Sequence, residues 1–153
     1  PSGHFIGQTS GHIDFRPLTD SHPRDRDFRT FFEREWAFMA DGADEVRVRT
    51  REVLRMGATQ VKLSIGGGAA SPYDPLDTTH YTVEEIRAAV RAAEGWGTYV
   101  MVHAYHDKSA LNALEAGVKS IDHGTLIRSE KTFAMMKEKG VVYCPQALIF
   151  SPT

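Results

Sequence analysis

The chain has 153 residues, of which 41% are hydrophobic and 25% charged, and its formal net charge is -2. These values are typical of one globular domain, and they exclude a disordered or collagen-like chain. The net charge gives no large basic surface for nucleic acid, and no apolar stretch is long enough to span a membrane. The single cysteine, Cys144, excludes an internal disulfide framework. We therefore expect a cytoplasmic protein without nucleic-acid or membrane partners.

A repeated pattern of amphipathic helix, glycine, β-rich run and polar loop follows an irregular first segment. The segment over residues 15–27 is rich in Asp, Arg and Pro, which predicts a long loop. Helices are predicted near residues 44–56, 83–96, 107–116 and 130–139. Strands are predicted over residues 59–65, 98–103, 119–123 and 141–144. Strand–helix alternation of this kind predicts an α/β fold with a parallel sheet, either half of a (β/α)8 barrel or a doubly wound sheet.

The helix over 83–96 has the clearest local signals. Thr82 and Glu85 form a capping-box pattern at its start. Helical periodicity predicts one buried face, made of Ile86, Ala89, Val90, Ala93 and Trp96. In the helix over 130–139, the same periodicity predicts that Phe133 and Met136 face inward.

Three polar residues interrupt the predicted strands, and they are the candidate metal-binding or acid–base residues. Lys62 alternates with aliphatic neighbours, so it faces away from the helices, where a buried amine must be paired, neutralised or modified. His103 and His123 close the next two strands, at the ends where α/β enzymes bind ligands. A structural role for each histidine and an exposed edge position for Lys62 remain open alternatives. The pattern as a whole indicates a metal site or an acid–base site.

The glycine-rich loop over residues 66–72 follows the strand that contains Lys62. It lacks the Lys-Ser/Thr ending of a P-loop and the spacing of a dinucleotide-binding loop. Its glycines are expected to let the backbone approach a ligand or another loop closely. Beyond it, Asp74, Asp77 and His80 are expected in a solvated loop, with substrate contact as the alternative.

Several segments together resemble the metal-dependent amidohydrolases. These segments are residues 8–12, 60–62, 66–72, 102–105 and 121–124. The branch that they resemble contains imidazolonepropionase-like proteins and Xaa-Pro or Xaa-Arg dipeptidases. The spacing agrees as well, with 41 positions from Lys62 to His103 and 20 from His103 to His123.

The resemblance implies a (β/α)8 barrel with divalent metal, usually one or two zinc ions, at its C-terminal mouth. It implies that Lys62 is carbamylated and bridges the metals, and that His103 and His123 bind one of them. It further implies that His12 and Tyr105 contact the substrate. A carbamate converts a buried cation into an anionic oxygen ligand, and Zn²⁺ accepts imidazole and oxygen ligands.

The sequence departs from the family pattern at two points. It contains no His-x-His pair, and no Asp closes a strand after Cys144. We therefore expect residues 1–153 to be the central part of an amidohydrolase barrel, roughly its third to seventh strands, which alone hydrolyses dipeptides poorly. The expected intact protein is a zinc-dependent hydrolase of dipeptides or N-acyl amino acids, and it could form a homo-oligomer. The alternatives are an inactive half-barrel that only associates with a partner, and a barrel hydrolase of cyclic amides, lactones or phosphotriesters.

Overall fold

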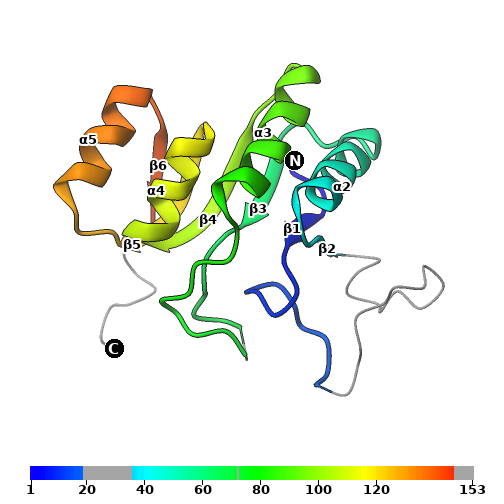
Figure 1. The fold of residues 1–153 in the computed structure, drawn as a ribbon, viewed down its shortest axis with the longest axis horizontal. Helices are drawn as coiled ribbons and strands as arrows, with labels where there is room; N and C mark the ends of the chain where they lie inside the picture. Colours follow the sequence, from blue (N-terminus) through cyan, green and yellow to red (C-terminus); the bar gives the residue numbers. More distant parts are fainter. Residues whose placement is uncertain (19–35, 72, 147–153) are drawn as a thin grey trace.

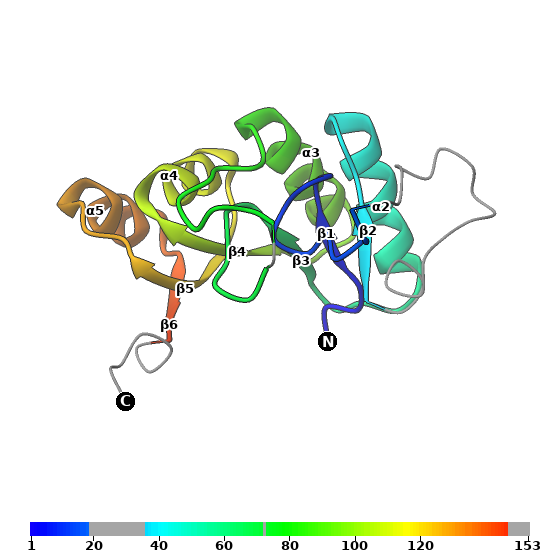
Figure 2. The ribbon, with the colours of Figure 1, turned by 90° about the horizontal axis from the view of Figure 1, so that it is seen from below.

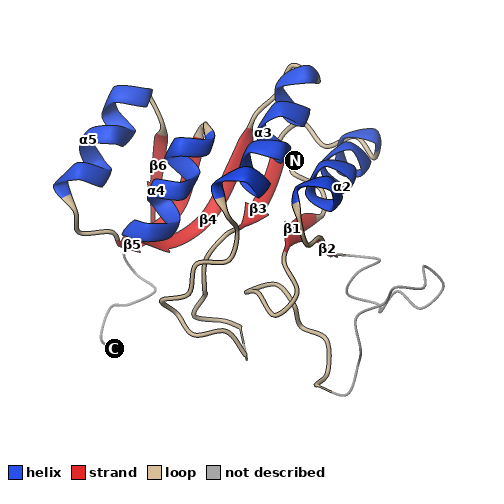
Figure 3. Cartoon of the chain, in the orientation of Figure 1, coloured by secondary structure: helices blue, strands red, loops and turns tan. Residues whose placement is uncertain are grey.

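The computed structural model describes residues 1–18, 36–71 and 73–146. Its strands are β1 (Phe5–Gly7), β2 (Ala37–Met39), β3 (Val61–Ser64), β4 (Val100–His106), β5 (Ser120–Leu126) and β6 (Val142–Pro145). Its helices are α2 (Ala43–Arg55), α3 (Val83–Gly95), α4 (Asp107–Ala116) and α5 (Glu130–Lys139). The predicted helices and four predicted strands are present, and β1 and β2 are additional (Figure 3). Most of the loop predicted over residues 15–27 lies outside the described residues.

The strands form one parallel sheet in the order β2-β1-β3-β4-β5-β6. From β3 onward each strand pairs with its successor in the sequence, as in a (β/α)8 barrel. β2 departs from this order because it pairs on the far side of β1. The loops after β1 and β3 leave the sheet at the same edge (Figure 1).

The sheet has one apolar face and one polar face. The helices lie together on one side of the strands (Figure 2). Their buried side chains share a single core with the apolar strand residues, which include Val61, Leu63, Val102 and Ile121. Because neighbouring strand residues alternate, Lys62 and Ser64 face the other side, as the sequence predicts. In the parallel register, Ser64 is level with His103, and His103 is level with Asp122.

Most local signals in the sequence correspond to observed contacts. The Thr82–Glu85 capping box forms at the start of α3, and the first four residues of its predicted apolar face are buried. Trp96 is an exception, because it caps the helix beyond the last turn and is 64% exposed. Phe133 is another, since it lies 40% exposed on α5 while Met136 is buried. Within the described part of the chain, no helix has the length and apolar composition needed to cross a membrane.

Candidate active site

Lys62 is held on the polar face of the sheet by an ion pair with Asp122. Its ammonium donates a hydrogen bond to Asp122 Oδ2, two strands away on β5. Their side chains are 12% and 16% exposed, so both charges are largely removed from water. Burial lowers the pKa of Lys62, while the hydrogen bond and charge of Asp122 oppose that shift. No pattern in the sequence singles out Asp122, because its pairing with Lys62 depends on the register of three strands.

His103 occupies the centre of the site, at the level where β4 meets the glycine-rich loop. It is 4% exposed, and its Nε2 lies 2.9 Å from the Gly67 carbonyl oxygen. Because a carbonyl only accepts, Nε2 donates and Nδ1 keeps the lone pair of the neutral ring. Burial, followed by the charge of His12, lowers the pKa of His103 to about 3.

His12 reaches the same centre from the loop after β1. Its ring stacks on the ring of His103, with centroids 4.2 Å apart and an interplanar angle of 14°. Gly68 packs directly against His12, since an added Cβ at that position would lie 2.0 Å from two atoms of the ring. The predicted close approach of the glycine-rich loop to another loop is therefore present. Burial and the charges of His123 and Lys62 lower the pKa of His12, which favours a neutral ring.

His123 joins this cluster through an unusual backbone conformation. Its φ is 74°, and the register between β4 and β5 shifts beside it, between Ala104 and His106. Regular alternation would place His123 opposite to Asp122. Instead its ring lies 4.7 Å from that of His103 and 5.5 Å from that of Tyr105, measured between centroids.

One further contact, together with burial, defines the protonation of His123 and Tyr105. His123 Nδ1 lies 2.7 Å from Gln146 Oε1, so Nδ1 donates and Nε2 keeps the lone pair. Burial lowers the pKa of His123, although the bond with Gln146 opposes the shift. Burial raises the pKa of Tyr105, which keeps its phenol protonated and able to donate.

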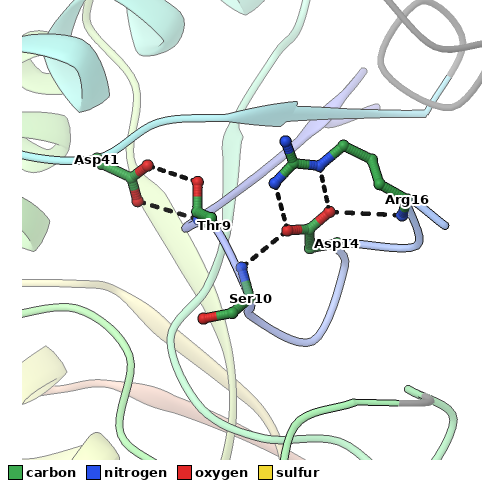
Figure 4. A network of polar contacts seen from close by, with 5 residues as sticks. All are labelled: Thr9, Ser10, Asp14, Arg16 and Asp41. Carbon is green, nitrogen blue, oxygen red and sulfur yellow. Dashed lines mark hydrogen bonds and ion pairs between the residues drawn. The ribbon is translucent and has the colours of Figure 1, made fainter. Parts of the chain in front are cut away.

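A polar network, buried at Asp14 and Arg16 and exposed at Asp41, shapes the loop that carries His12 (Figure 4). Arg16 donates two hydrogen bonds of 2.6 Å to the carboxylate of Asp14, and the Ser10 amide donates a third of 2.8 Å. Burial alone would raise the pKa of Asp14, but these hydrogen bonds bring it below the usual value. Thr9 is tied to Asp41 by its amide and its hydroxyl, which joins the loop to the segment after β2. The network thus fixes the backbone segments that precede and follow His12.

The segment after the glycine-rich loop differs from the solvated loop that the sequence predicts. Asp77 is exposed, but the side chains of His80 and Asp74 are each only 3% exposed. His80 Nε2 lies 3.0 Å from Thr78 Oγ1 and 3.3 Å from Asp74 Oδ2. Burial raises the pKa of Asp74 and lowers that of His80 to about 4, so the His80 ring is neutral and its contact with Asp74 is not an ion pair. The His80 ring packs on Gly11, where an added Cβ would lie 3.1 Å from its Nδ1.

The donor set suits part of a metal centre. His103 and His123 each donate one ring N–H to an oxygen and keep a lone pair on the other nitrogen, as metal-binding histidines usually do. Within residues 1–18, 36–71 and 73–146, however, no three His, Cys, Asp or Glu side chains form a group that could hold a metal ion. The ring contacts and the charge of Lys62 nonetheless show that the structure brings together all five predicted residues, Lys62, His103, His123, His12 and Tyr105. Their roles as ligands and substrate contacts stay predictions.

Comparisons with known proteins bear on the fold and the family of the chain. The family model described as "Amidohydrolase family" matches residues 14–150. Ochratoxinase from Aspergillus niger is 32% identical over 105 residues, which are 69% of this chain and 22% of that protein. A prolidase solved with N-methylphosphonate-L-proline is 41% identical, with a TM-score of 0.86 over 95% of this chain and 35% of the other. A Xaa-Pro dipeptidase with methionine bound in its active site is 32% identical, with a TM-score of 0.78 over 94% and 34% of the two chains.

The chain thus spans about a third of the length of these solved relatives, and its six parallel strands correspond to part of a TIM barrel. The family match covers most of the chain, including the strands that carry Lys62, His103 and His123. The chain belongs to the amidohydrolase family.

Proposed function

We propose that the protein hydrolyses the amide bond of dipeptides or N-acyl amino acids, and that its activity depends on a divalent metal, preferably zinc. Lys62, His103 and His123 are the proposed ligands, and His12 and Tyr105 the proposed substrate contacts. The observation that carries this proposal is the convergence of four aromatic side chains beside a buried lysine. These are His12, His103, Tyr105 and His123, and their rings meet at the edge of the sheet.

The protonation states of the two ligand histidines support metal binding. Each ring is neutral and has one nitrogen free to ligate, while a protein oxygen orients the other. When bound, zinc would lower the pKa of its water to about 7 and polarise a carbonyl oxygen.

Lys62 becomes a third ligand if its amine is carbamylated. In that reaction the neutral amine adds CO2, a new N–C bond forms, and one proton leaves. Burial favours the neutral amine because it lowers the pKa of Lys62. The carbamate is anionic, so it would give up the present ion pair with Asp122 and provide oxygen ligands instead.

His12 and Tyr105 are suited to bind the polar groups of a substrate. Tyr105 presents a protonated hydroxyl, and neutral His12 can donate one hydrogen bond and accept another. Both rings contact His103, so a substrate held by them would lie next to the proposed metal ligands. The relatives named prolidase and Xaa-Pro dipeptidase favour dipeptides that end in proline as the first substrates to test.

The proposal is tested by metal analysis and hydrolysis assays on the full-length protein. We expect one or two zinc ions per chain, activity on Xaa-Pro or other dipeptides, and loss of activity after chelation that added zinc restores. Undiminished hydrolysis by chelated, metal-free protein would contradict metal dependence. Turnover of lactones or phosphotriesters with none of amides would contradict the substrate class.

A further inference from the structure

An arginine-lined groove lies on the helical side of the sheet, between α2 and α3. Its volume is about 470 Å³, which is within the usual range for small-ligand sites. The residues that line it are Ala43, Arg47, Arg51, Glu84, Arg87, Ala88, Arg91 and Ala92. Four arginines and one glutamate give this groove a local charge of +3, although the chain as a whole carries -2. The small alanines keep the space between the helices open.

The charge arrangement within the groove is unfavourable for isolated helices. Arg47 and Arg51 are four residues apart on α2, and Arg87 and Arg91 are four apart on α3. Like charges at this spacing repel and destabilise a helix, whereas a bound anion would relieve the repulsion.

The acidic residues nearby neutralise only part of this charge. Arg47 forms an ion pair of 2.8 Å with Asp44, and Arg87 lies 3.9 Å from Glu115. Arg51 and Arg91 have no ion-pair partner among the described residues, and both are exposed. Two guanidinium groups, one from each helix, are therefore available to a ligand in the groove.

The choice of basic residue also separates these two helices from the others. Every basic residue of α2 and α3 is arginine, whereas every basic residue of α4 and α5 is lysine. Arginine presents a planar fork of donors that binds phosphate in a bidentate manner, and lysine cannot do so.

We propose that this groove binds a small ligand through two or more phosphate groups. The ligand is recognised by its phosphates, because none of the described residues that line the groove is aromatic and could stack on a nucleobase. The site is separate from the polar face with Lys62 and His103, and it does not depend on the proposed amide hydrolysis.

Isothermal titration with pyrophosphate tests this proposal, with far-UV circular dichroism to confirm that each variant folds. We expect one saturable site per chain. We expect the double variant Arg51→Gln/Arg91→Gln to weaken binding about tenfold or more, as the loss of charge-assisted hydrogen bonds does. Arg55→Gln is the matched control, since Arg55 lies on α2 outside the groove and pairs with Glu52. Glu84→Gln should tighten binding because Glu84 is the one acidic residue among the described residues that line the groove.

Four results would contradict the proposal. Pyrophosphate binding that does not saturate would show that there is no specific site. An equal loss of affinity in Arg55→Gln would show that the binding reflects general surface charge. Tighter binding of citrate than of pyrophosphate would exclude phosphate as the preferred group. The Arg51→Lys/Arg91→Lys variant tests bidentate recognition. Affinity for pyrophosphate between that of wild type and that of the glutamine variant would support it, and full retention of the wild-type affinity would contradict it.

Discussion

The rings of His12 and His103 are stacked with centroids 4.2 Å apart, and Gly68 packs against the same His12 ring. His12 comes from the loop after β1, His103 from β4 and Gly68 from the loop after β3. One close contact therefore joins three segments that are far apart in the sequence. The position of His12 depends on the absence of a side chain at residue 68.

Gly68→Ala is expected to displace His12 and weaken substrate binding. Its Cβ would lie 2.0 Å from ring atoms of His12, which must move away. We expect KM for a dipeptide to rise about tenfold, as for one lost hydrogen bond to a charged group, with a smaller change in kcat. Gly95→Ala is the control, because no atom lies within 4 Å of its added Cβ, and it should leave KM unchanged. An unchanged KM in Gly68→Ala would contradict the role of His12.

Because Lys62 and Asp122 form an ion pair, we expect the effects of substituting them on the free energy of unfolding to be strongly non-additive. Asp122→Leu leaves the buried ammonium unpaired, which should lower the free energy of unfolding by roughly 3–5 kcal/mol at neutral pH. Lys62→Met/Asp122→Leu should be less destabilised than Asp122→Leu alone, because no unpaired charge remains. Urea unfolding of the single and double variants measures this difference. Additive losses would show that the two side chains do not interact.

His123→Ala should reduce kcat more than Tyr105→Phe does. A lost ligand disturbs the metal and its water, whereas a lost phenol removes one donor, which typically reduces the rate about 10²–10³-fold. We also expect zinc content to fall in His123→Ala and to stay normal in Tyr105→Phe. If His123→Ala lowers only thermal stability, with full zinc content and faster turnover than Tyr105→Phe, then His123 is structural.

Stability is expected to fall as the pH decreases from about 6.5 to 4, partly because of His80. The pKa of His80 is about 4 in the folded chain and 6.5 in the reference state. Between these values the unfolded chain binds more protons, so acidification favours unfolding. Asp74 acts in the opposite direction near the lower end, because burial raises its pKa. His80→Gln should flatten the dependence of Tm on pH over this window, and an unchanged slope would contradict the burial of His80.

Local patterns in the sequence predicted much of the fold, and tertiary geometry determined the rest. The capping box and the aliphatic alternation around Lys62 depend on nearby residues, so they could be recognised. Strands β1 and β2 have three residues each, too few for a periodic pattern. Trp96 fits the helical period but lies past the end of α3, where that period no longer defines a buried face.

In the candidate site, too, local patterns predicted some residues and tertiary geometry determined the others. Lys62 and His103 could be selected because a polar residue in an apolar strand is unusual, although His103 lies within β4 and does not close it, since that strand continues to His106. Asp122 stands beside His123 in the sequence, but its importance depends on strand register and on the ion pair across β4. The orientation of His123 depends on a φ of 74°, which regular alternation does not predict. The buried His80 side chain packs on Gly11, a residue 69 positions away.

Anomalous scattering at the zinc edge from crystals of the full-length protein tests the central claim most directly. We expect a zinc peak within about 2.1 Å of His103 Nδ1 and His123 Nε2, with a carbamate on Lys62 as a further ligand. A protein that hydrolyses dipeptides but binds zinc elsewhere, with Lys62 still paired to Asp122, would contradict the account.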